Sequence, residues 1–203
     1  KIFLTMIYSA QSGHPGGSLS MADIISALYY KYLNIKPEDP NWKDRDMLIL
    51  SKGHACPVLY GVLAMKGFFP MEEIYTLRRF GSILQGHPDM KRVPGLDMSS
   101  GSLGQGLSVG CGVALGQKAL KNGARTYVVL GDGELDEGQV WEAAMLANKY
   151  KLNNLIAIVD NNGLQIDGTN ESVMPLDPLD KKWESFGWRV LKIDGHDMKD
   201  ICS

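Results

Sequence analysis

The sequence contains little cysteine, no basic cluster and no long apolar run, and each absence narrows the function. Only three of the 203 residues are cysteine, an odd number without metal-ligand spacing. We interpret Cys56, Cys111 and Cys202 as free thiols of a reducing compartment, and we expect a cytoplasmic protein. Lysine and arginine form no run, and 21 basic residues stand against 23 acidic ones. Composition therefore gives no electrostatic reason to expect nucleic acid or an anionic membrane as a partner.

Apolar runs are too short to cross a bilayer, and the sequence has no internal repeat or low-complexity segment. The first ten residues imitate a signal peptide, with Lys1 before a short apolar run and then Ser9-Ala10. Because the chain opens mid-pattern without Met, we instead expect a helix that starts before residue 1. The segment 198–203 similarly breaks off within an expected helix. We predict that residues 1–203 form a single domain that lacks its extreme terminal segments.

Three segments, 126–132, 154–161 and 188–195, carry continuous apolar runs that end in polar residues. Continuous runs predict strands that are buried on both faces, as in a parallel sheet. The amphipathic segment 138–152 has the right length for a right-handed crossover helix between the first two strands. A short apolar run at 47–51 predicts another strand. We therefore predict an α/β fold of three layers, in which helices cover both faces of a mostly parallel sheet.

Apolar residues at helical spacing predict further helices at 20–33, 57–67 and 70–80. The segment 104–116 is a helix rich in glycine: Gly106, Gly110, Gly112 and Gly116. Each glycine costs a helix up to about 1 kcal/mol relative to alanine. Close packing is the expected compensation, either against the sheet or across a subunit interface, and the sequence leaves both alternatives open.

A carboxylate stands between two glycines where the segment 126–132 ends, in Gly131-Asp132-Gly133. Asn162 follows the next predicted strand 30 positions later (162 − 132 = 30), about one strand–helix–strand circuit. Because parallel strands end at the same edge of a sheet, we expect Asp132 and Asn162 to lie close together. Carboxylate and amide oxygens suit a hard cation such as Mg²⁺ that is shared with phosphate. Glycine leaves room for a bulky ligand, and the Gly133 amide could contact a diphosphate.

Simple turns and the common nucleotide-binding loops account less well for these polar clusters than a cation shared with phosphate does. Asp, Asn and Gly are common turn residues, but two such clusters joined by one crossover helix favour a ligand site. A dinucleotide site would require Gly-x-Gly-x-x-Gly, whereas here Gly131 and Gly133 are followed by Gly138. A Walker loop would require a Gly-Lys-Ser/Thr ending, which is absent. A metal-bridged diphosphate is therefore the favoured ligand.

Gly-Asp-Gly, followed about thirty residues later by Asn-Asn, resembles the signature of thiamine diphosphate enzymes in general. More specific motifs resemble transketolase, in order and at its spacing: SGHPGGSLSMADI (12–24), SKGHACPVLYG (51–61), QGHPD (85–89), GSLGQGLSVGCGVA (101–114) and LQIDG (164–168). The resemblance runs through essentially the whole chain. It implies the thiamine diphosphate-binding fold and covers only the diphosphate-binding (PP-type) domain. Full-length transketolases continue with a pyrimidine-binding domain and a third domain, so the chain is similar to the N-terminal subunit of a split bacterial enzyme.

The resemblance also implies roles for individual residues. Mg²⁺, for which Ca²⁺ or Mn²⁺ could substitute, would be bound by Asp132, Asn162 and the backbone carbonyl of Leu164. Further cofactor contacts would come from His54, Gly101, Ser102, Leu103 and Gly133. The catalytic set would be His14, His87 and Glu137.

His14 and His87 would face the substrate, since imidazole can accept or return a proton near neutral pH. A lone Gly-His pair usually marks a loop histidine, but three histidines at family spacing favour a site. Glu137 matches a family glutamate at the subunit interface; its plainer interpretation is an acid at a helix N-terminus. We interpret His196 as a turn residue, and Glu134 and Asp136 as solvated charges.

The implied activity is transfer of a two-carbon ketol unit from a ketose phosphate to an aldose phosphate, as in the pentose phosphate pathway. Because the glutamate that activates the aminopyrimidine belongs to the pyrimidine-binding domain, the chain would be inactive alone. It would need a C-terminal partner subunit, in a heterotetramer formed as a dimer of heterodimers. Two alternatives stay open: a related ketol transferase for another sugar phosphate, and a thiamine diphosphate-binding module without catalysis. The substrate-side histidines argue against the second.

Overall fold

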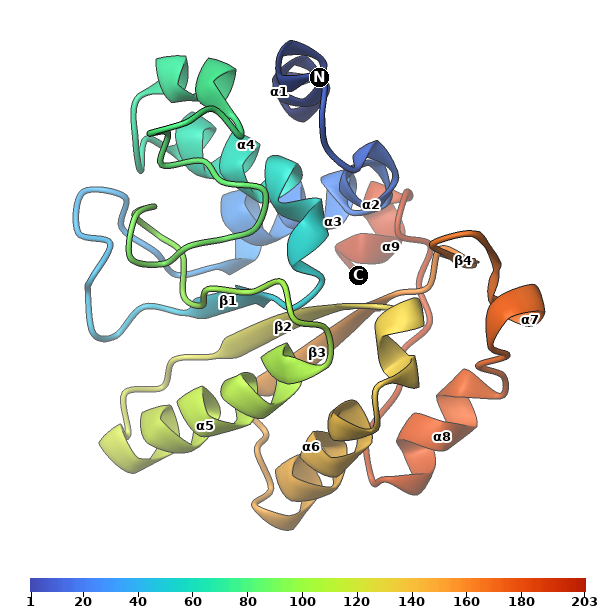
Figure 1. The fold of residues 1–203 in the computed structure, drawn as a ribbon. Coiled ribbons are helices and arrows are strands. Elements are labelled where there is room, and N and C mark those ends of the chain that lie inside the picture. Colours follow the sequence, from blue (N-terminus) through green and yellow to red (C-terminus); the bar gives the residue numbers. More distant parts are fainter.

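The computed structural model describes residues 1–203, built around a three-stranded parallel sheet (Figure 1). The strands are β1 (Met47–Leu50), β2 (Thr126–Gly131) and β3 (Leu155–Asp160), in the order β1-β2-β3. The pairing register aligns Gly131, the last residue of β2, with Asp160, the last residue of β3. Both strands therefore deliver their following loops to the same edge of the sheet, as the sequence predicted.

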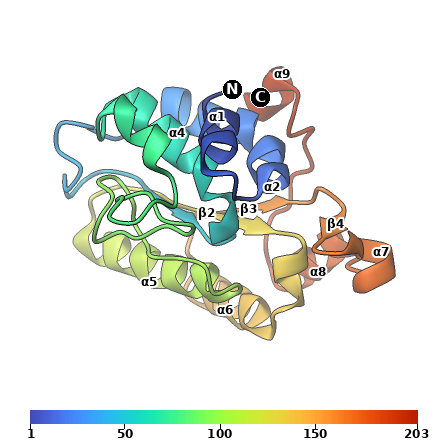
Figure 2. The ribbon, with the colours of Figure 1, turned by 45° about the horizontal axis from the view of Figure 1, so that its top comes forward.

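Helices cover both faces of this sheet (Figures 1 and 2). On one face lie α1 (Ile2–Ala10), α2 (Pro15–Ser20), α3 (Ala22–Ala27) and α4 (Cys56–Lys66). On the other lie α5 (Gln105–Leu120) and α6 (Gly138–Lys149), which is the predicted crossover helix. The three-layer α/β prediction is confirmed.

Strand β2 supplies side chains to both cores, which explains its continuous apolar run. Tyr127 and Val129 belong to the core beneath the helices α1, α3 and α4. Val128 and Leu130 belong to the second core, beneath α5 and α6. All six residues of β2 are buried, as expected for a central strand of a covered parallel sheet.

The glycines of α5 divide between a packed face and an open one. A Cβ at Gly106 would lie 2.3 Å from the Ser51 Oγ, and one at Gly110 would lie 2.4 Å from the Val128 Cγ2. These two glycines allow α5 to approach the sheet at distances that no side chain could tolerate. A Cβ at Gly112 or Gly116 would meet nothing within 4 Å. Packing against the sheet therefore accounts for half of the glycines.

Smaller elements complete the fold beyond these layers. They are the π-helical turn η1 (Leu28–Tyr32), the 3₁₀ turns η2 (Gly53–Ala55), η3 (Met71–Thr76) and η4 (Gly133–Asp136), the antiparallel strands β4 (Leu164–Gln165) and β5 (Gly168–Thr169), and the short helices α7 (Asn170–Val173), α8 (Leu179–Ser185) and α9 (Met198–Ile201). The expected helices at both ends of the chain are present as α1 and α9. None of the helices combines the length and the apolar character that a bilayer span requires.

Three predicted elements differ in the structure. The predicted strand at 188–195 has no regular secondary structure and pairs with no strand, and its residues are exposed or half-buried. The predicted helix at 70–80 is only the 3₁₀ turn η3, because Arg78 adopts a left-handed conformation (φ 61°) and its N–H bonds to the Leu84 carbonyl. The predicted helix at 20–33 is divided into the end of α2, then α3 and the π turn η1.

Candidate active site

Two loops that follow β2 and β3 meet at the carboxyl edge of the sheet, around Asp132. The Asp132 side chain is 2% exposed. Its Oδ1 accepts a hydrogen bond from the Gly133 N–H (2.9 Å), and its Oδ2 accepts one from the Gly163 N–H (2.8 Å). The Asn170 Nδ2 also donates to Oδ2 (2.8 Å). The expected neighbourhood of Asp132 and the loop of Asn162 is therefore confirmed, whereas their role stays a prediction.

No cationic side chain pairs with Asp132. The ion pairs of the structure involve other carboxylates. Burying an ionised carboxylate is costly unless a positive charge compensates it. The partners of Asp132 are neutral amide groups, so a bound cation would supply the missing charge.

Asn162 and Leu164 offer two further oxygen donors beside Asp132. The Asn162 Oδ1 accepts a hydrogen bond from the Leu164 N–H (3.0 Å), and its Nδ2 donates to the Asp160 Oδ2 (3.2 Å). Both Asn162 and Leu164 are exposed. A carboxylate, an amide oxygen and a backbone carbonyl are the hard donors that Mg²⁺ prefers. No group of three or more His, Cys, Asp or Glu residues is placed to bind a metal, and only one of the proposed donors belongs to these residue types.

Sequence reasoning missed the ion pair between Lys52 and Asp160 beneath this edge. The Lys52 side chain is 1% exposed and that of Asp160 is 8% exposed. The Lys52 Nζ and the Ser20 Oγ both donate to the Asp160 Oδ2. A signal was available, since Lys52 lies two residues after an apolar strand and Asp160 ends another. Only the fold, however, brings two residues 108 positions apart together.

Three histidines, His14, His54 and His87, lie near one another in the structure. His14 precedes α2, and its ring lies 5.7 Å from that of His54 in an edge-on arrangement. Burial lowers the pKa of His54 to about 4, and the positive charge of the nearby Lys52 ammonium group adds to this effect. Burial also lowers the pKa of His87, with Arg78 and His14 as further causes. His54 and His87 are therefore neutral at pH 7.

The backbone that carries His87 is anchored by α4. The Tyr60 hydroxyl, on a fully buried side chain, lies 2.9 Å from the His87 carbonyl and 3.1 Å from the Gln85 carbonyl, and donates to them. The Cys56 thiol donates to the Gly86 carbonyl (3.2 Å). Burial raises the pKa of Cys56 to about 12, so this thiol is an inert hydrogen-bond donor rather than a nucleophile.

The loop of Gly101, Ser102 and Leu103 passes close to these histidines. A Cβ at Gly101 would lie 3.1 Å from the His87 ring, and the φ of 146° at Gly101 is one that other residues rarely adopt. Glycine is therefore required for the loop to approach His87. This places the predicted cofactor-contacting loop beside a predicted substrate-facing histidine.

Glu134 was predicted to be a solvated charge, and this prediction is wrong. Its side chain is 2% exposed. The carboxylate accepts hydrogen bonds from the Ser51 hydroxyl, the Gly104 N–H (2.9 Å) and the Gly131 N–H (3.0 Å). Burial raises the pKa of Glu134, and these hydrogen bonds oppose the rise. Glu134 thus joins the ends of β1 and β2 to the start of α5.

The remaining predicted residues lie near the surface. Glu137 precedes α6 and is exposed, and Asp136 beside it is exposed as predicted. A Cβ at Gly104 would lie 2.7 Å from the Glu137 Cβ, so α5 begins next to Glu137. His196 lies in a turn, as predicted, with its Nδ1 3.0 Å from the Asp23 Oδ2. This contact raises the pKa of His196.

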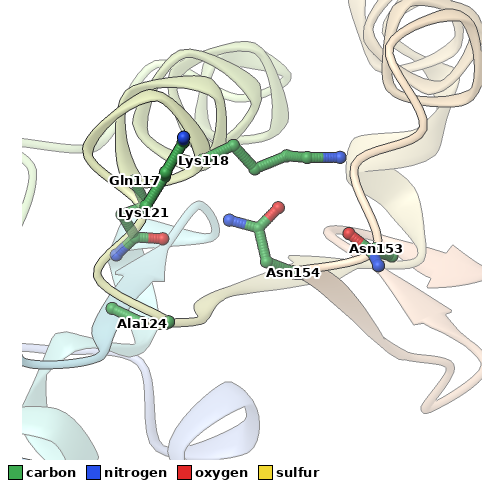
Figure 3. Close-up of a pocket in the computed structure, with 7 residues that line it drawn as sticks. Gln117, Lys118, Lys121, Ala124, Asn153 and Asn154 are labelled. Carbon is green, nitrogen blue, oxygen red and sulfur yellow. The ribbon is translucent and has the colours of Figure 1, made fainter.

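A separate hollow lies at the opposite, amino end of the sheet (Figure 3). Its lining comes from the end of α5 and from the loops before β2 and β3: Gln117, Lys118, Lys121, Gly123, Ala124, Asn153 and Asn154. The Lys118 ammonium group donates to the Lys151 carbonyl (2.6 Å) rather than standing free. None of the predicted site residues lies in this hollow.

Solved structures share this fold closely. The chain superposes on transketolase from Pichia stipitis in complex with sedoheptulose 7-phosphate with a TM-score of 0.94, at 35% identity over 98% of this chain and 31% of that one. Transketolase from Campylobacter jejuni gives a TM-score of 0.93, also at 35% identity, over 98% of this chain and 32% of that one. The chain therefore spans about a third of the length of these solved transketolases.

Curated relatives include shorter proteins that the chain covers more fully. The 6-deoxy-6-sulfo-D-fructose transketolase subunit SqwG of Clostridium sp. (strain MSTE9) is 48% identical over 100% of this chain and 74% of its own length. One subunit of the apulose-4-phosphate transketolase of Phocaeicola vulgatus is 47% identical over 99% of this chain and 71% of its own length. Human transketolase is 43% identical over 96% of this chain and 31% of its own length. The family of the transketolase thiamine diphosphate-binding domain matches residues 2–203. This chain belongs to the transketolase family and contains its thiamine diphosphate-binding domain.

Proposed function

We propose that this chain is the thiamine diphosphate- and Mg²⁺-binding subunit of a split transketolase. With a C-terminal partner subunit, it transfers a two-carbon ketol unit from a ketose phosphate to an aldose phosphate. The observation that carries the metal site is the buried Asp132 carboxylate, which has no ion-pair partner at the edge where Asn162 also lies. Asp132, the Asn162 Oδ1 and the Leu164 carbonyl would hold Mg²⁺. The Gly133 amide and His54 would contact the diphosphate.

The protein's own groups account for orientation and proton transfer. When bound, thiamine diphosphate supplies the electron sink that cleavage of a C–C bond beside a ketose carbonyl requires. The lowered pKa of His87 keeps its imidazole neutral at pH 7, ready to accept a proton from a sugar hydroxyl. His14, whose ring packs edge-on against His54, would serve the same sugar. His54 would donate an N–H to the diphosphate without adding a positive charge, because its pKa is also lowered.

A partner subunit is supported by the relatives that are themselves named as subunits, of which the chain covers 71–74%. Glu137 is exposed at the start of α6 and would contact the partner subunit. Two such pairs would form a dimer of heterodimers, and the chain would be inactive alone. The two free thiols buried in the core, Cys56 and Cys111, support a cytoplasmic location.

The donor sugar is a ketose with an anionic group, and the relatives favour a choice beyond the common pentose phosphates. One relative is named for 6-deoxy-6-sulfo-D-fructose and another for apulose 4-phosphate. A ketol transferase for such a sugar is therefore the second candidate function. Both candidates use the same cofactor site and differ in the donor sugar.

Calorimetric titration with thiamine diphosphate, with and without Mg²⁺, tests the cofactor site. We expect binding that requires Mg²⁺ in the wild type and is lost in Asp132→Asn, a variant that keeps the size of the side chain. Asp136→Asn changes an exposed acid in the same turn and should bind as the wild type does. Binding that ignores both Mg²⁺ and the Asp132 substitution would refute the metal-bridged site.

Activity measured with the subunit encoded beside this chain tests the partner and the substrate. We expect ketol transfer only when both subunits, thiamine diphosphate and Mg²⁺ are present. The kcat/KM values, measured for a panel that includes xylulose 5-phosphate, apulose 4-phosphate and 6-deoxy-6-sulfo-D-fructose, would rank these donors. Full turnover by the purified single chain would contradict the proposed dependence on a partner.

A further inference from the structure

Asp160 is the meeting point of three segments beside the proposed metal site. Its Oδ2 accepts hydrogen bonds from the Lys52 ammonium group, from the Ser20 hydroxyl and from the Asn162 Nδ2 (3.2 Å). These donors come from the turn after β1, the end of α2 and the loop after β3. One carboxylate oxygen therefore connects Asn162 to the turn after β1 and to the end of α2.

Fold stability alone is a weak reason for this arrangement. The side chains of Lys52 and Asp160 are 1% and 8% exposed, so both charges are removed from water. Replacing a buried ion pair with apolar residues of similar size is often neutral or stabilising, because the charges lose their hydration when they are buried. Physical grounds therefore favour a function for the pair beyond holding the fold together, and the bond to Asn162 indicates which one.

The network fixes the orientation of the Asn162 amide. A carboxylate can only accept a hydrogen bond, so the Nδ2 of Asn162 must face Asp160. A backbone N–H can only donate, so the Oδ1 must face the Leu164 N–H, 3.0 Å away. This bond uses one of the two lone pairs of Oδ1 and leaves the other for a cation. If the amide were reversed, its Nδ2 would face the Leu164 N–H, so that two donors would meet. Its Oδ1 would then face the Asp160 carboxylate, so that two acceptors would meet.

We propose that Asp160 is a positioning residue, which holds the Asn162 amide with its oxygen toward the divalent cation. This inference rests on the proposed function, since it concerns the same metal site. Lys52 holds the Asp160 carboxylate in place and neutralises it, so Asp132 remains the one charged protein ligand of the cation. The cation and the diphosphate thereby meet a site that is oriented before either of them binds.

Two double variants separate the role of the acceptor from that of the ion pair. Lys52→Met/Asp160→Ala removes both charges and the acceptor for Asn162, whereas Lys52→Met/Asp160→Asn removes both charges but keeps an amide oxygen at position 160. We expect the Ala double variant to lose about 10–100-fold in Mg²⁺ affinity, measured by titrating Mg²⁺ at fixed thiamine diphosphate, as for other residues that orient metal ligands. The Asn double variant should stay near the wild type, as should Ser20→Ala.

A second measurement uses the wild type and needs no disruptive variant. The side-chain amide resonance of Asn162, assigned by its loss in Asn162→Ala, should relax like the rigid backbone before Mg²⁺ is added. A freely rotating amide would overturn the proposal, as would equal Mg²⁺ affinities in the two double variants. If wild-type binding of thiamine diphosphate itself ignores Mg²⁺, the proposed function falls together with the inference. If the wild type requires Mg²⁺ and the double variants match, only the inference falls.

Discussion

Replacing single glycines of α5 by alanine would measure how closely this helix packs on the sheet. Gly110 and Gly112 both lie within the helix, so alanine should gain about 0.8–1 kcal/mol of helix propensity at either position. Their surroundings differ. The added Cβ at Gly110 would lie 2.4 Å from the Val128 Cγ2 and 3.4 Å from the Leu155 Cδ1, whereas at Gly112 it would meet nothing within 4 Å.

The magnitude follows from this difference. Carbon atoms normally approach to about 3.5–4.0 Å, so Gly110→Ala forces α5 or Val128 to move by about 1 Å or more. Such overpacking typically costs about 1–3 kcal/mol. The propensity gain cancels when the two variants are compared, so their free energies of unfolding should differ by this overpacking cost alone. For a chain of this size, the midpoints of thermal unfolding should differ by about 2–12 °C.

Urea unfolding of the two purified variants beside the wild type is the assay. We expect Gly112→Ala to be more stable than the wild type and Gly110→Ala to be less stable than Gly112→Ala. Gly116→Ala, which also meets nothing within 4 Å, is a second control and should behave as Gly112→Ala does. Adding Val128→Ala to Gly110→Ala should lower the free energy of unfolding by less than Val128→Ala does in the wild type, because the methyl group added at position 110 fills the space that the Val128 side chain leaves. Equal stabilisation by alanine at both positions would refute the close contact between α5 and β2.

Three other predictions concern the candidate site. Because burial and Lys52 lower the pKa of His54 to about 4, its ring should stay neutral from pH 8 to 5.5 in an NMR titration. An ordinary midpoint near 6.5 would contradict this. Since the unfolded chain binds this proton at higher pH than the folded one, His54 favours unfolding as the pH falls from about 6.5 to 4. Glu134→Gln places an amide donor among three donors and should cost about 1–3 kcal/mol in urea unfolding, whereas the exposed Asp136→Asn should change stability by about 0.5 kcal/mol or less. Tyr60→Phe removes the hydroxyl bonded to the His87 carbonyl and should cost about 0.5–1.5 kcal/mol; in the assembled enzyme it should lower kcat/KM while the affinity for thiamine diphosphate, measured by calorimetry, stays unchanged.

The sheet could be predicted from sequence because its central strand has an unambiguous pattern. A strand that faces two cores needs apolar side chains on both faces, and the run 127–130 within β2 meets this condition. The segment 188–195 has the same pattern, and Trp188 and Val190 do pack against the second core. Yet this segment pairs with no other strand, and Leu191 is 72% exposed. An apolar run is therefore not sufficient for a strand, because a strand also needs a hydrogen-bonding neighbour, which lies far away in sequence.

The candidate site shows the same division between local and distant information. The position of Asp132 between two glycines at the end of a strand is a local feature, and the sequence predicted its neighbourhood with Asn162 correctly. The burial of Glu134 depends on Ser51 and Gly104, which are 83 and 30 positions away. A charged residue in a turn resembles a solvated acid until the fold brings hydrogen-bond donors around it.

The three buried acids of this edge acquire different properties from their surroundings alone. Asp160 faces the Lys52 ammonium group, so its charge is already compensated within the protein. Glu134 accepts hydrogen bonds from a hydroxyl and two backbone amides, and these bonds join separate chain segments. Burial raises its pKa. Asp132 is as buried as Glu134 but keeps neutral donors only, at the point where the loops from two strands converge. If Lys52 had instead paired with Asp132, the uncompensated charge would lie on Asp160, and a divalent cation would gain little at Asp132. The pairing of one lysine with one of three acids thus decides where the cation-binding charge remains.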